Sequence, residues 1–210
     1  MSDFNTDTSA SSTECVKQDD CSNKCHRMCH SFNKLDAIRI DQSHSLCRRL
    51  NKAVEVIENT LRLYLPSNGT NAEDDGHIFI SFNGGKDATV VLHLLHYVLY
   101  KQHRLHLLGP TIKVIYFDDP HQFPAIEQFI KDSLHSLQVE PVTFKCSFKE
   151  GVERAKETYN LQAVLMGVRL GDPYTDDAEH FHPSTANYPA FMRVYPILHW
   201  DYADGMRCNG

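Results

Sequence analysis

A short polar loop with two adjacent glycines is the part of this chain best suited to chemistry. Its residues, Ser81–Asp87, read Ser-Phe-Asn-Gly-Gly-Lys-Asp and follow an apolar stretch at 77–80. Residues 88–100, rich in valine and leucine, come next with the spacing of a helix. A strand that runs through glycines into a helix exposes backbone N–H groups at the helix N-terminus, where phosphate binds. The loop therefore predicts a phosphate site.

The residue types inside this loop favour pyrophosphate binding over a purely structural turn. Adjacent Gly84 and Gly85 let the backbone fold around such a group. Lys86 can supply positive charge, and Asp87 can hold Mg²⁺. The loop is neither a Walker A motif nor a dinucleotide fingerprint, because its glycines are adjacent and Lys-Asp follows them. The alternative is a tight turn before a charged helix start, but the polar residues that precede the glycines favour phosphate binding.

Helical and strand patterns alternate around the loop. Helices are expected at 46–65, 88–100, 122–137 and 148–159, and strands at 77–80, 111–117, 140–146 and 163–166. This alternation predicts an α/β fold with a doubly wound, mostly parallel sheet and helices on both faces. In the helix at 122–137, the residues expected to face inward are Phe123, Ile126, Phe129, Ile130 and Leu134. From residue 171 onward the pattern fades into a polar loop.

Ligands bind at the carboxyl ends of the strands in sheets of this kind. Three loops are expected to meet there, at 81–87, 117–120 and 167–174. The sequence therefore places its candidate chemistry on one edge of the sheet.

Composition narrows the class of protein. The chain has 210 residues, a hydrophobic content of 41% and a net charge of −6. This size suits one α/β domain with tails, and the absence of a basic stripe argues against binding to duplex nucleic acid. No run approaches the roughly 18 apolar residues of a membrane span. The first residues are polar, without an apolar leader, so the expected location is cytoplasmic.

Three segments are expected along the chain: a disordered, cysteine-rich tail at 1–45, one folded domain at 46–204 and a short end at 205–210. The tail combines four cysteines with two histidines, namely Cys15, Cys21, Cys25, Cys29, His26 and His30. Such ligands could hold zinc or copper, but the usual CxxC spacing of zinc sites is absent. A disordered tail without metal is the favoured interpretation.

The glycine loop resembles the pyrophosphate loop of the phosphoadenylyl-sulfate reductase-like, or N-type ATP pyrophosphatase, superfamily. Phe123–Phe129, Gly167–Tyr174 and Tyr188–Trp200 occur in the same order as in the eukaryotic FAD synthase family, so residues 46–204 are similar to that family. The resemblance implies a fold like that of the adenine nucleotide alpha hydrolases. It also implies an FMN adenylyltransferase that converts ATP and FMN into FAD and pyrophosphate, with Mg²⁺.

The same resemblance implies three groups of site residues. Those nearest the reacting phosphate are Asn83, Asp87 and Asp172, with Asp87 also the Mg²⁺ ligand. Those that bind ATP are Ser81, Gly84, Gly85, Lys86, Phe117, Asp118, Gly167 and Arg169. Those that bind FMN are Asp172, Ser184, Asn187 and Arg193. Gly167 would let the ligand approach the backbone. Because the FMN phosphate is already an anionic nucleophile, alignment and charge neutralisation matter more than a strong base.

Several of these residues also have a purely structural interpretation. Phe117 is as well suited to the core as to the adenine, because strand ends often bury aromatic rings. Asp172 precedes a proline and could simply begin a turn. Arg193 lies between apolar neighbours, where an unpaired charge is costly, so an anionic partner is favoured. His180 and His182 are more readily solvated loop residues than acid–base groups.

Two departures from the family leave other functions open. Leu170 and Gly171 replace a basic residue and a threonine, and the family's next helix and basic segment do not follow residue 204, so the domain is expected to be truncated. One alternative is a truncated, catalytically impaired nucleotide-binding form. The other is a different enzyme of the superfamily, such as a sulfonucleotide reductase or an RNA-thiolating enzyme. The Arg-Cys-Asn context of Cys208 does not match the Glu-Cys-Gly of the reductases.

Overall fold

The computed structural model describes residues 21–65, 77–173, 175–201 and 204. The chain divides into two compact units, Met1–Ala37 and Ile38–Gly210. Helix α1 spans Cys21–Ile40. The predicted disorder of the tail is therefore wrong for residues 21–40, which contain neither glycine nor proline to break a helix. The side chains of Cys15, Cys21, Cys25, Cys29 and His26 lie outside the described residues, so the metal alternative is not tested.

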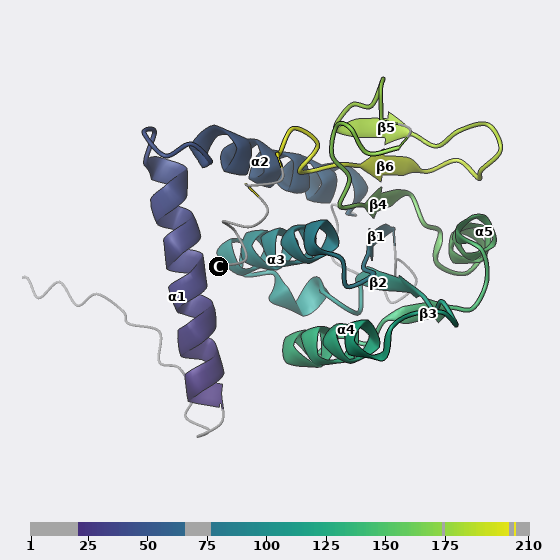
Figure 1. Ribbon diagram of the computed structural model, residues 1–210, viewed down its shortest axis with the longest axis horizontal. Coiled ribbons are helices and arrows are strands. Elements are labelled where there is room, and N and C mark those ends of the chain that lie inside the picture. The colour runs from purple at the N-terminus through teal and green to yellow at the C-terminus, as the bar shows by residue number, and fades with distance from the viewer. Residues whose placement is uncertain (1–20, 66–76, 174, 202–203, 205–210) are drawn as a thin grey trace, which may run out of the picture. The chain divides into compact units, whose positions relative to one another are not determined.

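The second unit is built on a six-stranded sheet with the order β3-β2-β1-β4-β6-β5 (Figure 1). The strands are β1 (Ile78–Ser81), β2 (Ile112–Phe117), β3 (Val142–Phe144), β4 (Ala163–Leu165), β5 (Phe181–Pro183) and β6 (Met192–Val194). All neighbouring pairs are parallel except β5 and β6, which are antiparallel. This confirms the predicted mostly parallel α/β sheet.

Strands β5 and β6 lie in the segment for which the sequence predicts only loop. Each has three residues, too few to show an alternating pattern, and their register places two polar side chains, His182 and Arg193, opposite each other. Pairing of β6 with β4, which joins Ala163 to Met192, supplies the hydrogen bonds that extend the sheet. These strands therefore depend on a partner that is distant in sequence.

The remaining helices are α2 (Cys47–Tyr64), α3 (Lys86–Lys101), α4 (Pro124–Leu137) and α5 (Phe148–Tyr159), and a short 3₁₀ turn lies at Leu105–Leu107. All four confirm the predicted positions to within two residues. The two faces of the sheet follow from the alternation of its side chains. Phe79 and Ile115 pack with Val152 of α5, whereas Ile78 and Ile80, which are also fully buried, point to the opposite face. Helices therefore cover both faces.

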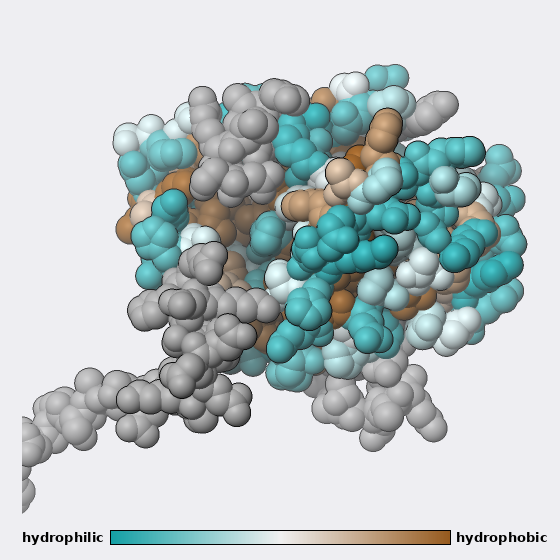
Figure 2. All heavy atoms as spheres, turned by 60° about the horizontal axis from the view of Figure 1, so that its bottom comes forward, coloured by the Kyte–Doolittle hydropathy of each residue, from teal (hydrophilic) through white to brown (hydrophobic). Residues whose placement is uncertain are grey.

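Helix α4 packs on a narrower stripe than the sequence predicts. Ile130 and Leu134 are buried, one helical turn apart, but Phe123 is 72% exposed and Phe129 is 44% exposed. The inward orientation expected for these two phenylalanines is therefore wrong. Figure 2, which brings the lower side of Figure 1 forward, shows small hydrophobic patches among hydrophilic residues. Across the described ranges, no helix combines the length and apolar character that a bilayer span requires.

Candidate nucleotide site

The loop between β1 and α3 requires glycine at its first glycine position. Gly84 has φ +73°, and a Cβ there would lie 2.9 Å from Cγ1 of Ile130. Gly85 then adopts an extended conformation and begins α3. Asn83, expected to act at the reacting phosphate, accepts a 3.0 Å hydrogen bond from the Gly85 N–H through Oδ1. This contact makes a tight asparagine turn, so Asn83 shapes the loop.

The N-terminus of α3 is suited to an anion. No side chain caps this helix, and its first intrahelical bond runs from the Thr89 N–H to the Gly85 carbonyl at 2.9 Å. The amides of the first turn have no acceptor within the helix, and the helix dipole adds positive potential there. Lys86 stands in the same turn. Ser81, the last residue of β1, lies at the carboxyl end of that strand. The predicted phosphate loop therefore has the required local geometry.

Gly167 brings the end of β4 into direct contact with this first turn. A Cβ on Gly167 would lie 2.5 Å from the Ala88 nitrogen and 2.5 Å from the Asp87 carbonyl carbon. The expectation was that glycine here admits a ligand to the backbone. The structure gives another reason, because the chain's own helix occupies that space. The loop after β4 and the phosphate loop thus form one joined surface.

An ion pair connects the same two loops through their side chains. The Arg169 Nε donates to Oδ2 of Asp87 at 3.1 Å, and both side chains are about one-fifth exposed, at 19% and 20%. Lys86 Nζ lies 3.8 Å from Oδ1 of the same carboxylate. Asp172 accepts a 2.8 Å bond from the Arg169 backbone N–H through Oδ2. Four predicted site residues are therefore brought together, with two cations beside the helix N-terminus.

The geometry of Asp87 does not fit the Mg²⁺ ligand that the sequence suggested. Its Oδ2 is bound to Arg169, and its Oδ1 is buried without a hydrogen-bond partner. Mg²⁺ needs near-octahedral oxygen ligands and keeps several waters, which a buried oxygen beside two cations does not provide. Among the residues that the structure describes, no group of three or more histidine, cysteine or carboxylate side chains could hold a metal.

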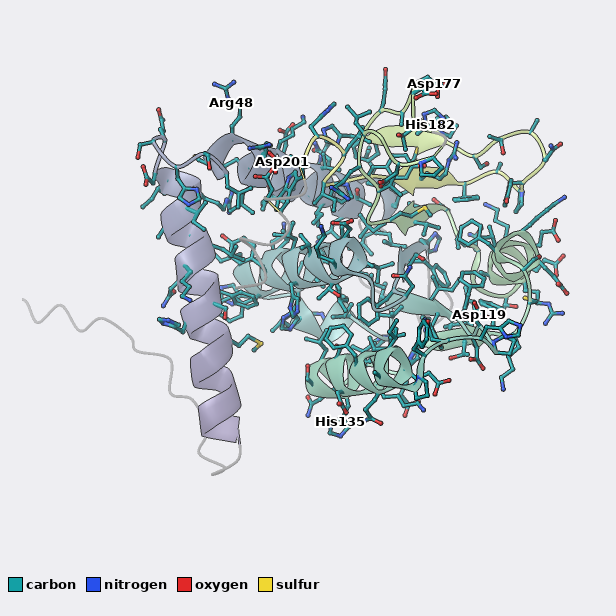
Figure 3. The ribbon with its side chains drawn as sticks, viewed as in Figure 1. Arg48, Asp119, His135, Asp177, His182 and Asp201 are labelled. Carbon is teal, nitrogen blue, oxygen red and sulfur yellow. The ribbon has the colours of Figure 1, made fainter. Side chains whose placement is uncertain are left out.

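Phe117 ends β2 and Asp118 follows it, but their side chains have different surroundings. The Phe117 ring packs against Phe144 and Phe148, with centroids 5.9 and 5.1 Å apart, so its ring belongs to the core of the α5 face. This packing favours a role for Phe117 in the core over contact with adenine. Asp118 donates its backbone N–H to the Phe144 carbonyl and pairs with Lys145 at 3.4 Å. Figure 3 labels Asp119, the next residue, in the same loop.

Of the residues expected to bind FMN, Ser184, Asn187 and Arg193 lie on the other side of β4, whereas Asp172 lies beside Arg169. Arg193 is on β6, level with Val164 of β4, and donates to the Pro183 carbonyl at 2.9 Å. Its Nε is buried without a hydrogen bond, which leaves the predicted anionic partner a place. Ser184 donates to the Pro189 carbonyl at 2.8 Å and so shapes the turn in which Asn187 is exposed. This group is therefore separate from the phosphate loop along the sheet.

The histidines near this group are not the free loop residues that the sequence predicts. His182 lies on β5, opposite Arg193, as its label in Figure 3 shows. His180 Nδ1 lies 2.7 Å from the Tyr195 carbonyl, and its ring meets His199 edge-on at 5.1 Å. Burial lowers the pKa of His180. Both residues are half-buried, His182 through the pairing of β5 with β6, which the sequence did not predict, and His180 through its contacts with Tyr195 and His199.

A cavity of about 620 Å³ lies beside the phosphate loop, between α3 and α4. Gly84 and Lys86 form one end, and Phe129 and His93 lie along its length. Desolvation by the surrounding protein lowers the pKa of His93, although its side chain remains open to solvent through the cavity. Sequence reasoning missed His93, because a histidine inside a leucine-rich helix carries no signal that it faces a cavity. The helical spacing of Ile126 in α4 was a signal that this residue could line the opposite wall of the cavity.

Comparison with known proteins adds an independent line of observation. Residues 77–150 match the phosphoadenosine phosphosulfate reductase domain, which here includes β1, the phosphate loop and α4. A probable FAD synthase of Caenorhabditis elegans is 32% identical over 165 residues, which cover 75% of this chain and 28% of the relative. A probable FAD synthase of Schizosaccharomyces pombe is 28% identical over 163 residues, which cover 76% of this chain and 58% of the relative. The chain thus spans less than two thirds of either relative.

Solved structures agree with this on the fold. The Candida glabrata FMN adenylyltransferase, in complex with FAD and inorganic pyrophosphate, has a TM-score of 0.72 at 23% identity and covers 88% of this chain. The match covers 65% of that enzyme. A second crystal structure of the same enzyme is 25% identical, with a TM-score of 0.69. The domain match and the curated relatives show that this chain is similar to the phosphoadenosine phosphosulfate reductase domain and to the FAD synthases, and the solved structures show that it shares the fold of an FMN adenylyltransferase.

Proposed function

We propose that this chain carries the nucleotide site of an FMN adenylyltransferase, an enzyme that makes FAD and pyrophosphate from ATP and FMN. The observation that supports it best is the uncapped N-terminus of α3 after two glycines, faced by Arg169 across the sheet edge. The related C. glabrata enzyme has been solved with FMN and an ATP analogue. Because the chain spans only part of its relatives, its activity, substrates and partners are proposals.

The proposed reaction joins two phosphates. An oxygen of the FMN phosphate forms a bond to the α-phosphorus of ATP, and the bond from that phosphorus to the bridging oxygen breaks. The electron pair leaves with pyrophosphate. First-turn amides of α3 and Lys86 bind the departing pyrophosphate, and Arg169 offsets the negative charge that develops. The FMN phosphate needs no strong base, so the residues act chiefly by alignment and charge.

The other site residues have supporting roles in this proposal. Ser81 and Asp118 stand at the carboxyl ends of β1 and β2, where the adenosine part of ATP would lie. Arg193 supplies positive charge for the flavin nucleotide, with Ser184, Asn187 and Asp172 nearby in sequence. Mg²⁺ would arrive with ATP, and no step is assigned to it, since Asp87 does not fit it. The free thiols of Cys47 and Cys146 suit the proposed cytoplasmic location.

The experiment incubates the purified chain with ATP, FMN and MgCl₂ and separates FAD from FMN by chromatography. We expect FAD to form, and Lys86→Ala to lower the rate about 100-fold through loss of phosphate contact and charge. Lys131→Ala is the matched control, because Lys131 is an exposed lysine of α4 that pairs with Glu127 at 3.7 Å. FMN and ATP binding without FAD would instead favour a nucleotide-binding form. Absence of binding by either nucleotide would overturn the proposal.

A further inference from the structure

Asp87 lies at the centre of a small charged cluster that joins two loops far apart in sequence. Its carboxylate contacts Arg169, 82 residues away, at 3.1 Å and Lys86 at 3.8 Å. Both cations stand at the positive end of α3, so without an anion between them they would repel each other and the helix dipole. A carboxylate placed here offsets that repulsion before any ligand arrives.

One oxygen of Asp87 is bound within the protein and the other is enclosed by it. Oδ2 is the acceptor for Arg169, and Oδ1 is buried from solvent. Only about one-fifth of the side chain is exposed. The enclosed Oδ1 is out of reach of a fully hydrated cation, and the negative charge of the carboxylate would repel a phosphate that approached it directly. Its contribution to the site must therefore pass through the residues that it holds.

The backbone around Arg169 is fixed as well. Gly167 packs on the first turn of α3, and Asp172 accepts the Arg169 backbone N–H at 2.8 Å. With the backbone held by these two contacts, the remaining freedom of Arg169 is that of its long side chain. The bond from Nε to Asp87 removes much of that freedom and leaves the terminal nitrogens of the guanidinium for another anion.

We propose that Asp87 is a positioning residue, which holds the Arg169 guanidinium beside Lys86 at the N-terminus of α3 so that both cations meet the same anion, and that it is not a metal ligand. The inference rests on the proposed function in one respect, since the anion is taken to be the pyrophosphate part of a nucleotide. A guanidinium held in advance loses less conformational entropy when the anion binds.

Asp87 as a positioning residue and Asp87 as a metal ligand predict different pyrophosphate affinities when no metal is present. We would measure the binding of inorganic pyrophosphate by calorimetry, once in EDTA and once with Mg²⁺. Asp87→Asn should weaken binding about tenfold under both conditions, because Arg169 is no longer held. A metal ligand would give a different result: Asp87→Asn would bind as well as or better than the unchanged chain in EDTA, and would be weaker only with Mg²⁺. That result would overturn the inference.

Control variants separate positioning from a general loss of structure. Glu150→Gln is the matched control, because Glu150 also stands in the first turn of a helix and bonds an arginine, Arg154, at 2.8 Å. It should leave pyrophosphate binding unchanged. Asp87→Glu keeps the charge but displaces it, so it should also weaken binding in EDTA, and it serves if Asp87→Asn fails to fold. Thermal unfolding monitors folding in every variant.

A double-mutant cycle tests whether Asp87 acts through Arg169. In an Arg169→Gln background, Asp87→Asn should change pyrophosphate affinity by less than about twofold, because the group it positions is gone. Full additivity of the two changes would overturn the inference while the proposed function stands. If the unchanged chain binds neither pyrophosphate nor ATP, the proposed function fails, and the inference fails with it.

Discussion

At the scale of single residues, the polar side chains expected to do chemistry are occupied in shaping the site. Asn83 binds the Gly85 N–H, Asp172 binds the Arg169 N–H and Asp87 binds the Arg169 side chain. Each contact fixes a backbone or a cation at the edge of the sheet. The groups that would meet a ligand are first-turn amides of α3 and the cations of Lys86 and Arg169, which suits an anion.

The requirement for glycine at position 84 can be tested against another glycine with positive φ. In Gly84→Ala, the new Cβ meets Ile130 at 2.9 Å in a left-handed backbone, so we expect a loss of about 2–4 kcal/mol in unfolding free energy and weaker ATP binding. In Gly171→Ala, φ is +93° but no atom lies within 4 Å, so a loss of about 1 kcal/mol is expected. Urea denaturation measures both. Equal losses would show that contact with Ile130 does not matter.

Burial of His96 predicts a pH dependence of stability. Burial lowers the pKa of His96 from its ordinary value of 6.5 to about 4. The unfolded chain therefore binds more protons between these values, so stability falls as the pH drops from about 6.5 to about 4 and levels off below. The full effect is of order 3 kcal/mol. His96→Gln should reduce the difference in urea midpoint between pH 7 and pH 5. His135→Gln, at an exposed position of α4 labelled in Figure 3, should not.

At the scale of elements, the site depends on how closely the loop after β4 packs against α3. The sheet places β4 next to β1, and Gly167 then lies against the backbone of Asp87 and Ala88. This contact keeps Arg169 opposite the phosphate loop. Because it joins backbone to backbone, no rotation of a side chain can relieve an added methyl group.

Gly167→Ala should therefore separate the two loops. A Cβ at 2.5 Å from the Ala88 nitrogen and the Asp87 carbonyl carbon forces backbone displacement, and we expect a loss of about 2–4 kcal/mol in unfolding free energy. Pyrophosphate affinity should fall at least tenfold, because Arg169 moves away from α3. Calorimetry at a temperature where the variant is folded checks the second effect. An unchanged affinity would show that the distance between these loops does not matter for binding.

At the scale of the second unit, the segment after β6 contacts α2. Arg49 pairs with the fully buried Asp204 at 2.7 Å and with Asp201 at 3.1 Å, and its carbonyl accepts from the Trp200 indole at 3.2 Å. Figure 3 shows Asp201 beside α2, whereas Arg48 points away from the protein. These contacts hold the segment after β6 in place, and none of them involves a residue of the phosphate loop.

Arg49→Met should thus affect stability and leave binding intact. Loss of the guanidinium removes the ion pair with the buried carboxylate of Asp204 and the one with the exposed carboxylate of Asp201, with an expected cost of about 3 kcal/mol in unfolding free energy. Arg48→Met is the control, because Arg48 is exposed, and it should change stability by less than about 0.5 kcal/mol. Pyrophosphate affinity should be the same in both variants and in the unchanged chain. A drop in affinity for Arg49→Met alone would indicate coupling between α2 and the site.

Local pattern alone determined much of this protein. The apolar spacing of α2, α3 and α5, the strand–glycine–helix junction and the parallel sheet are visible in the sequence, because helix and strand periods and the φ of Gly84 are properties of neighbouring residues. The same holds for the resemblance to the FAD synthases, since four short motifs in order carry it. For these features, a residue's neighbours in the chain are also its neighbours in space.

Only the tertiary structure decided what the site residues do. The pair between Asp87 and Arg169, the contact of Gly167 with α3 and the addition of β6 beside β4 all join segments far apart in sequence. The exposure of Phe123 likewise depends on what α4 packs against, not on its own period. Charge pairing and close approach are set by distances across the fold, which residue order does not contain. The sequence thus determined that a phosphate loop exists, and the packing of β4 on α3 decided which cations face it.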